Sequence, residues 1–279
     1  MDLVVMQRLG LPTEDSESDL TAWRAFVDKV KNPTKFVEVA LVGKYTELPD
    51  AYKSINEAFI HAGAMNDSKV KVRYVKAEKV TAESAAELFE GVSGIFVAPG
   101  SGSRGVDGKI AAVKYARENN IPFFGIGLGM HCAAVEFARN VLGLEDAASA
   151  ELDATTKHPV VSLMEENKIE KGSVRRIGGY VCTLNPESKS AKAYGITSVM
   201  ERHSNSYEFN TDYREQFEAA GMKCVGINPE TQLVEVFELE NHPWYVATQY
   251  HPEYKSTVEH PAPLFVDFVA AALKYSETK

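Results

Sequence analysis

Residues 121–130, "IPFFGIGLGM", have the pattern of a turn that in many enzymes carries a catalytic nucleophile. An apolar run leads into closely spaced glycines and then a helix-like segment, as in a strand, a sharp turn and a helix. The tip of such an elbow projects its side chain into a cleft, beside backbone N–H groups that form an oxyanion hole. The tip here is Gly127, which has no side chain. A glycine turn that only permits close packing is an equally good interpretation.

The segment "QYHPEYKS", residues 249–256, offers a second possible piece of chemistry. His251 and Glu253 are two residues apart, so a strand that continued through both would place their side chains on one face. A carboxylate beside an imidazole orients the ring and raises its basicity, as a general base requires. A surface histidine close to a carboxylate is the alternative.

Two other polar segments are less specific. Residues 97–105, "VAPGSGSRG", contain glycines and serines whose N–H groups can face an anion, although an ordinary glycine loop has the same composition. Residues 199–210, "VMERHSNSYEFN", taken alone indicate a solvated loop between strands.

The elements that position these residues follow from the alternation of strand-like and helix-like segments between residues 36 and 140. This alternation predicts an α/β fold with a mostly parallel central sheet and helices on both faces, in flavodoxin-like layers. Residues 97–105 and 125–129 follow strands, so they should border one pocket at the carboxyl ends of the sheet. The expected strands are 36–45, 69–77, 94–100 and 121–127, and the second half adds 157–164, 179–184, 223–228, 233–239 and 244–253. The expected helices are 19–33, 49–63, 83–92, 108–119 and 261–275.

The N-terminal part is expected to differ from the rest. Residues 1–18 are predicted to be a flexible leader that ends in an acidic linker, 12–19, and residues 19–279 to form a single domain. Asp19 is the expected N-cap of helix 19–33, whose apolar residues share one face. Gly63 is expected to end helix 49–63.

Composition excludes several classes of protein. The 279-residue chain is 44% hydrophobic, enough for one sizeable core, and its formal net charge of −9 argues against nucleic-acid and anionic-membrane surfaces. No apolar run approaches the roughly 18–20 residues that span a bilayer. Three scattered cysteines predict a reducing, cytoplasmic location without disulfides, and no metal or cofactor site is expected from their spacing.

Several stretches together resemble one family. "VALVGKYTELPDAYKSINEAFIHAG", "GKIAAVKYARENNIPFFGIGLGM", "VEFARNVLGLEDAASAE" and "QYHPE" are similar to the glutamine amidotransferase domain of CTP synthase, a class I amidotransferase with a Cys-His-Glu triad. The resemblance runs from about residue 19 to 275, and "MQRLGLP" resembles the end of that family's synthetase domain. It implies glutamine hydrolysis that supplies ammonia to a synthetase domain or subunit for CTP synthesis, without a cofactor.

The resemblance assigns roles to residues that this chain retains. His251 and Glu253 match the catalytic pair, Glu151 matches the residue that holds the glutamine amino group, and Leu128 matches the backbone partner beside the nucleophile. Tyr207 matches a residue of the substrate site.

Other positions depart from the family. Gly127 takes the place of the nucleophilic cysteine, so the chain has no thiolate there to form a thioester. The oxyanion loop, Pro-Gly-Gly-Phe-Gly in the family, reads Ala-Pro-Gly-Ser-Gly at 98–102, which leaves Gly100 and Ser101 as its donors. His131 replaces a glutamine of the substrate site. Ser206 replaces the arginine that binds the glutamine carboxylate.

These departures leave three hypotheses. The chain is a divergent CTP-synthase-type amidotransferase domain without thiol-dependent glutaminase activity, or a small-molecule hydrolase that uses His251 and Glu253 on another substrate. The third is a pseudoenzyme that binds a glutamine-like ligand or another polar amide or acid, or a synthetase-like partner, without chemistry. An amidotransferase altered only at Gly127 is the alternative to divergence.

Overall fold

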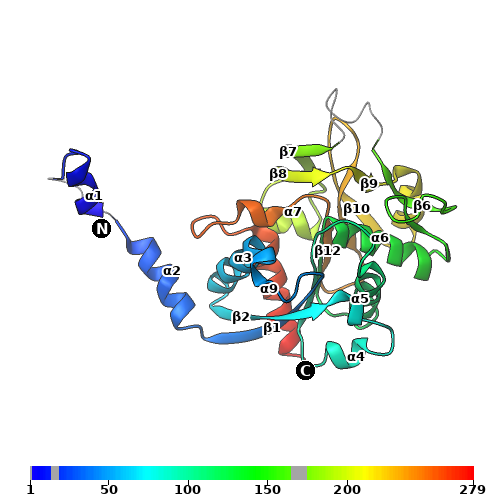
Figure 1. Ribbon diagram of the computed structural model, residues 1–279, viewed down its shortest axis with the longest axis horizontal. Helices are drawn as coiled ribbons and strands as arrows, with labels where there is room; N and C mark the ends of the chain where they lie inside the picture. Colours follow the sequence, from blue (N-terminus) through cyan, green and yellow to red (C-terminus); the bar gives the residue numbers. More distant parts are fainter. Residues whose placement is uncertain (1, 14–18, 165–174) are drawn as a thin grey trace.

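A nine-stranded mixed sheet forms the centre of the computed structural model, which describes residues 2–13, 19–164 and 175–279 (Figure 1). The strand order is β2-β1-β3-β4-β12-β11-β10-β7-β8. The strands are β1 (Lys35–Gly43), β2 (Ser68–Lys76), β3 (Gly94–Val97), β4 (Phe123–Ile126), β7 (Arg176–Leu184), β8 (Ser198–Asn205), β10 (Met222–Ile227), β11 (Val234–Leu239) and β12 (Tyr245–Thr248). A smaller sheet pairs β5 (Ala148–Ser149), β6 (Pro159–Leu163) and β9 (Tyr207–Phe209).

Helices cover both faces of the large sheet, as the alternation predicted. One face packs against α5 (Val106–Glu118) and α6 (Leu128–Asn140), with α4 (Ala85–Leu88) and α8 (Arg214–Ala219) beside them. The other face packs against α3 (Lys53–Met65), α7 (Lys189–Tyr194) and α9 (Pro263–Ser276). The predicted α/β fold is therefore confirmed.

The sheet divides into a parallel and an antiparallel part. Neighbouring strands from β2 through β1, β3 and β4 to β12 are parallel, and those from β12 to β8 are antiparallel. The parallel part contains the alternating segment from which it was predicted. β12 joins it from the end of the chain, which brings residues 249–256 beside the elbow at residue 127.

Two expected helix boundaries were wrong. Leu20, not Asp19, is the N-cap of α2 (Thr21–Lys31), although the Asp19 carboxylate accepts a hydrogen bond from the Thr21 N–H at 3.0 Å. α3 continues past Gly63 to Met65. A Cβ on Gly63 would lie 2.7 Å from the main-chain oxygen of Ser68, so this glycine permits close approach to β2.

The expected solvated loop at 199–210 was also wrong, because it forms β8 and β9. Along β8 the buried side chains alternate with exposed ones, and the buried ones include Glu201 and His203. Polar residues thus occupy inward positions and hide the two-residue period by which a strand is recognised.

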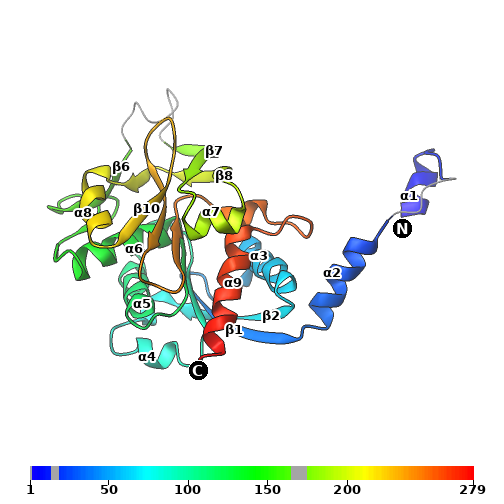
Figure 2. The ribbon, with the colours of Figure 1, turned by 180° about the vertical axis from the view of Figure 1, so that it is seen from behind.

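The N-terminal helices α1 (Asp2–Arg8) and α2 project away from the sheet in both views (Figures 1 and 2). The predicted leader therefore contains a helix, and residues 14–18 of the predicted linker lie outside the described residues. None of the helices in the described ranges is long and apolar enough to cross a membrane.

Candidate active site

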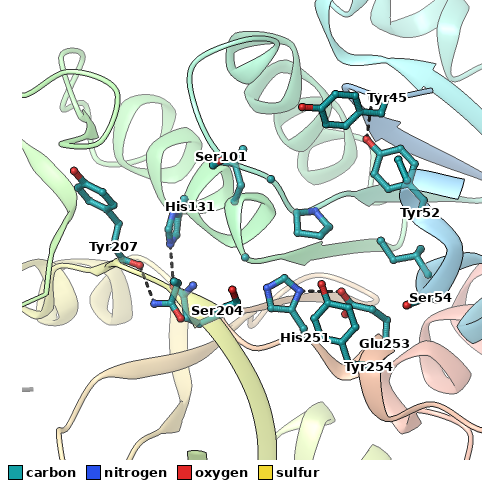
Figure 3. A pocket seen from close by; sticks show the side chains of 18 of the residues that line it. Tyr45, Tyr52, Ser54, Ser101, His131, Ser204, Tyr207, His251, Glu253 and Tyr254 are labelled. Carbon is teal, nitrogen blue, oxygen red and sulfur yellow. Dashed lines mark hydrogen bonds and ion pairs between the residues drawn. The ribbon is translucent and has the colours of Figure 1, made fainter. Parts of the chain in front are cut away.

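A pocket of about 650 Å³ lies at the carboxyl ends of the parallel strands (Figure 3). All of the residues predicted from the sequence line it, and Figure 3 shows Ser101, His131 and His251 around the cavity. These predicted residues are Gly100, Ser101, Gly127, Leu128, His131, Glu151, Ser206, Tyr207, His251 and Glu253. The lining also includes Tyr45, Asp50, Tyr52, Lys53, Ser54, Pro99, Arg175, Ser204, Asn205, Gln249 and Tyr254.

Gly127 forms the tip of the elbow between β4 and α6. Its φ of 54° and ψ of −110° lie in a region that residues with a side chain adopt only under strain. A Cβ built at this position would lie 3.6 Å from His251 Nε2 and 3.5 Å from the Pro99 Cβ, both ordinary van der Waals distances. The backbone therefore has the geometry of a nucleophile elbow, with room for a side chain directed at the imidazole.

The two flanking glycines serve packing instead. A Cβ on Gly129 would lie 2.4 Å from the main-chain oxygen of Val97, and one on Gly125 would lie 2.9 Å from the Gly129 carbonyl. Both interpretations of the glycine pattern thus apply, each to different residues: Gly125 and Gly129 let α6 approach the sheet, and Gly127 faces the pocket.

His251 and Glu253 form a buried hydrogen-bonded pair, with 2.8 Å between His251 Nδ1 and Glu253 Oε1. The strand expected to hold both residues ends earlier, at Thr248. A 3₁₀ turn, η5 (Pro252–Lys255), brings the carboxylate back to the ring instead. In the neutral ring, an Nδ1–H donated to Glu253 leaves Nε2 as the acceptor that faces residue 127.

Neighbouring groups fix the position of the His251 ring. Its main-chain N–H donates to the Arg202 carbonyl at 2.8 Å. The Tyr254 ring stacks on the imidazole with 5.0 Å between the centroids. The imidazole is thus held in the orientation that a general base needs.

The loop at 98–102 is oriented by Lys44, which follows β1 and is buried. Its ammonium group donates to the main-chain oxygens of Ser101 and, at 2.8 Å, of Gly102. Because a peptide group is planar and trans, the N–H paired with the Ser101 carbonyl points the opposite way. That N–H belongs to Gly102 and donates to Glu151 Oε1 at 3.1 Å, so Glu151 is linked directly to the loop.

A second buried lysine lies behind the same loop. Lys109 on α5 donates to the Ala98 carbonyl, and burial lowers the pKa of its ammonium group to about 8. On the opposite side, the Leu128 N–H belongs to the first turn of α6, where N–H groups have no acceptor within the helix. This N–H is the best placed oxyanion donor at the elbow.

His131 on α6 lies deep in the pocket wall. Its Nε2 is 2.9 Å from Gln249 Oε1, and because an amide oxygen can only accept, the ring N–H donates in this contact. Burial lowers the pKa of the imidazole. This contact turns the Gln249 amide group, and both side chains line the pocket. Ser206 and Tyr207 line it from the junction of β8 and β9.

Cys132 does not replace the missing thiolate. It lies one turn further along α6 and is 1% exposed, and burial raises the pKa of its thiol to about 11. Within the described ranges, there is also no group of three or more histidine, cysteine, aspartate or glutamate side chains that could bind a metal ion.

Sequence reasoning missed several of the residues that shape this site. Lys44, Lys109 and Arg175 stand outside the polar segments considered above, and Gln249 begins the segment 249–256 without an expected role there; each is recognised only from its contacts. A charged residue directly after an apolar strand, as Lys44 is after β1, was the one available signal.

Comparison with known proteins gives consistent results. A family model described as "Glutamine amidotransferase class-I" matches residues 47–271. CTP synthase from Cytophaga hutchinsonii is 53% identical over a 281-residue alignment that covers 100% of this chain and 52% of that protein. CTP synthase from Flavobacterium psychrophilum is 53% identical over 277 residues, which cover 99% of this chain and 51% of that protein.

The chain therefore spans about half the length of these curated relatives. The solved structure "Trypanosoma brucei CTPS - glutaminase domain with bound acivicin" matches with a TM-score of 0.80 and 38% sequence identity. The match covers 85% of this chain and 94% of that one.

Proposed function

This chain belongs to the class I glutamine amidotransferase family, and from that premise we propose that its pocket binds glutamine without hydrolysing it through a thioester. His251 and Glu253 supply the general base, Leu128 and Gly100 or Ser101 the oxyanion donors, and Glu151 the partner of the ligand's amino group. Gly127 occupies the position of the attacking thiol.

The observation that carries this proposal is the distance of 3.6 Å between His251 Nε2 and the Cβ position at Gly127. A thiol there would be within reach of the base that deprotonates it. Without the thiol, the imidazole has no nucleophilic side chain to activate at the elbow. The pocket can still bind glutamine and orient its side-chain amide, but no acyl group can be transferred to residue 127.

Two measurements on the unmodified chain test this proposal. Calorimetric titration with L-glutamine should detect binding, and an ammonia-release assay with glutamine should detect no turnover at ordinary enzyme rates of roughly 1 s⁻¹ or more. Absence of binding would refute glutamine as the ligand of this pocket. Ammonia release at such a rate would show that a thiol-independent route exists.

We infer the biological role from the relatives. Because their CTP synthase chains are about twice as long, the partner proposed for this domain is a synthetase domain or subunit that uses ammonia to make CTP. With Gly127 at the nucleophile position, the chain would serve such a partner as a divergent, ligand-sensing domain. Co-purification with a CTP-synthase-type synthetase would support this role.

A second candidate function rests on the intact base. The His251–Glu253 pair is ordered beside an open position at residue 127, and a water molecule activated there would make the pocket a hydrolase for small amides or esters other than glutamine. Such activity would be lost in His251→Ala. If the unmodified chain turns over no small amide or ester, the binding role is favoured instead.

A further inference from the structure

Arg175 lies in the wall of the pocket, at a position that no sequence motif marked. It directly precedes β7, and its Nη2 donates to the main-chain oxygen of Ser204 at 3.1 Å and to the Ser204 hydroxyl at 3.0 Å. These two contacts hold the guanidinium against the pocket-lining end of β8.

The register of β7 and β8 places this arginine next to Ser206. Arg176 and Asn205 form the last pair of the antiparallel ladder, so Arg175 and Ser206 are the residues that lie directly beyond this pair on the two strands. Both of them line the pocket. A long side chain at either position therefore reaches the same part of the pocket.

The neighbouring arginine cannot take this role. Side chains alternate between the two faces of a strand, and Arg176 is fully buried, with ion pairs of 2.8 Å to Glu208 and to Glu235. Arg176 thus stabilises the interior of the sheet, and Arg175 points to the pocket side.

The charges around the pocket favour one class of ligand. Among the pocket-lining residues that the structure describes, the lysine and arginine side chains are Lys53 and Arg175. The Lys53 side chain is 69% exposed at the start of α3, whereas the contacts with Ser204 hold the Arg175 guanidinium against β8. Glu151 presents a carboxylate to the same cavity. A guanidinium and a carboxylate in one pocket complement the carboxylate and ammonium groups of an α-amino acid.

We propose that Arg175 binds the α-carboxylate of an amino-acid ligand, from across the strand pair beside Ser206. A guanidinium matches a carboxylate with two parallel N–H···O hydrogen bonds, which a neutral side chain cannot supply. The identity of the ligand as glutamine rests on the proposed function. What is new is the role of Arg175, which would select ligands that carry an α-carboxylate.

The test is calorimetric titration with L-glutamine and with L-glutaminamide, in which a neutral amide replaces the α-carboxylate. Arg175→Gln should weaken glutamine binding by roughly 10- to 100-fold and leave the weak binding of glutaminamide unchanged. The matched control is Arg214→Gln, which removes an arginine on α8 outside the pocket lining and should bind glutamine like the unmodified chain.

A swap across the strands separates binding from folding. Arg175→Gln combined with Ser206→Arg should recover most of the lost glutamine affinity, because the cation returns from the opposite residue. If Arg175 only stabilised the start of β7, the added Ser206→Arg substitution would not restore glutamine affinity. Circular dichroism of each variant checks that the fold is kept.

The outcomes distinguish this inference from the proposed function. Equal glutamine binding by Arg175→Gln and the unmodified chain would overturn the role of Arg175 and leave the proposed function intact. Binding of L-glutamate or L-asparagine in place of glutamine, with the same dependence on Arg175, would support the inference and refute the proposed ligand. Absence of binding for all three amino acids would overturn both.

Discussion

At the scale of single residues, Gly127 has the backbone conformation of a nucleophile elbow but presents no side chain. A Cβ at this position meets nothing closer than 3.5 Å, so space does not require glycine. The backbone conformation does favour it, because φ is +54°. Glycine at this position therefore avoids the backbone strain that a residue with a side chain would carry.

This account predicts the effect of Gly127→Ala on stability. The methyl group fits, but the backbone strain should lower the free energy of unfolding by about 1–3 kcal/mol. Urea denaturation measures the change. Gly179→Ala on β7 is the control, because φ there lies outside the strained range and the added methyl meets only the Met200 side chain; it should change stability by less than about 0.5 kcal/mol. If Gly127→Ala were as stable as the unmodified chain, the predicted backbone strain at residue 127 would be refuted.

The sequence predicted which residues line the pocket, but it did not predict the contacts that hold their side chains in position. His251 and Glu253 were paired from their spacing, although the pair forms through a turn and not along a strand. Arg175 and Gln249 reach the pocket only because β7, β8 and β12 meet around it, which depends on strand order. No periodicity within one segment carries that information.

At the scale of elements, His242 connects the turn between β11 and β12 to the end of α5. The histidine is buried, its Nδ1 accepts from the Trp244 N–H, and its Nε2 is 3.3 Å from the Ala116 carbonyl. Burial lowers the pKa of this ring to about 4. The connection is therefore stable only while the imidazole is neutral.

The sign of the resulting pH dependence follows from linkage. An unfolded histidine takes up its proton near pH 6.5, and the folded one only near pH 4, so the unfolded state binds more protons between these values. The stabilising contribution is complete above pH 6.5 and is lost as the pH falls towards 4. Between pH 7 and 5, the free energy of unfolding of the unmodified chain should fall by roughly 2 kcal/mol more than that of His242→Gln, as measured by denaturation.

His260→Gln, at an exposed position, is the control for this prediction and should keep the full pH dependence of the unmodified chain. If His242→Gln kept that pH dependence as well, the assignment to His242 would be contradicted.

Element prediction succeeded where apolar periodicity was unbroken and failed where polar residues occupy buried positions. The parallel strands and their helices were recovered because their buried faces are apolar. The sequence of β8 indicates a loop because the polar residues Glu201 and His203 occupy its buried positions. Gly63 suggested a helix end, although the glycine serves contact with β2.

At the scale of the whole molecule, the N-terminal segment stands apart from the packed layers. All of α2 is described, and none of its residues is buried; Trp23 is 48% exposed. α2 contacts the rest of the chain through an ion pair between Lys29 and Asp67 and a ring contact between Phe26 and His61, among others. The apolar face predicted for this helix exists, but it does not form part of the core.

Removal of residues 1–31 should therefore leave the thermal midpoint within about 2 °C of that of the full chain, since surface contacts of this kind contribute little. Differential scanning calorimetry makes the comparison. Leu264→Ala in α9, which empties a fully buried position, is the reference for real core loss and should lower the midpoint by roughly 4–20 °C. A similar drop on removal of residues 1–31 would show that α1 and α2 belong to the folding unit.

The central claim is that the pocket keeps the arrangement of a glutaminase site around an empty nucleophile position. Gly127→Cys tests it most directly, with ammonia release and intact-protein mass spectrometry after incubation with L-glutamine. We expect a glutamyl adduct on the introduced thiol and slow ammonia release, roughly 10²–10³ below ordinary rates. Pro99 stands where the family's oxyanion loop has a glycine, so one N–H donor is lost even if Gly100 or Ser101 donates. The unmodified chain should give neither signal. A folded Gly127→Cys variant that forms no adduct and releases no ammonia would contradict the claim.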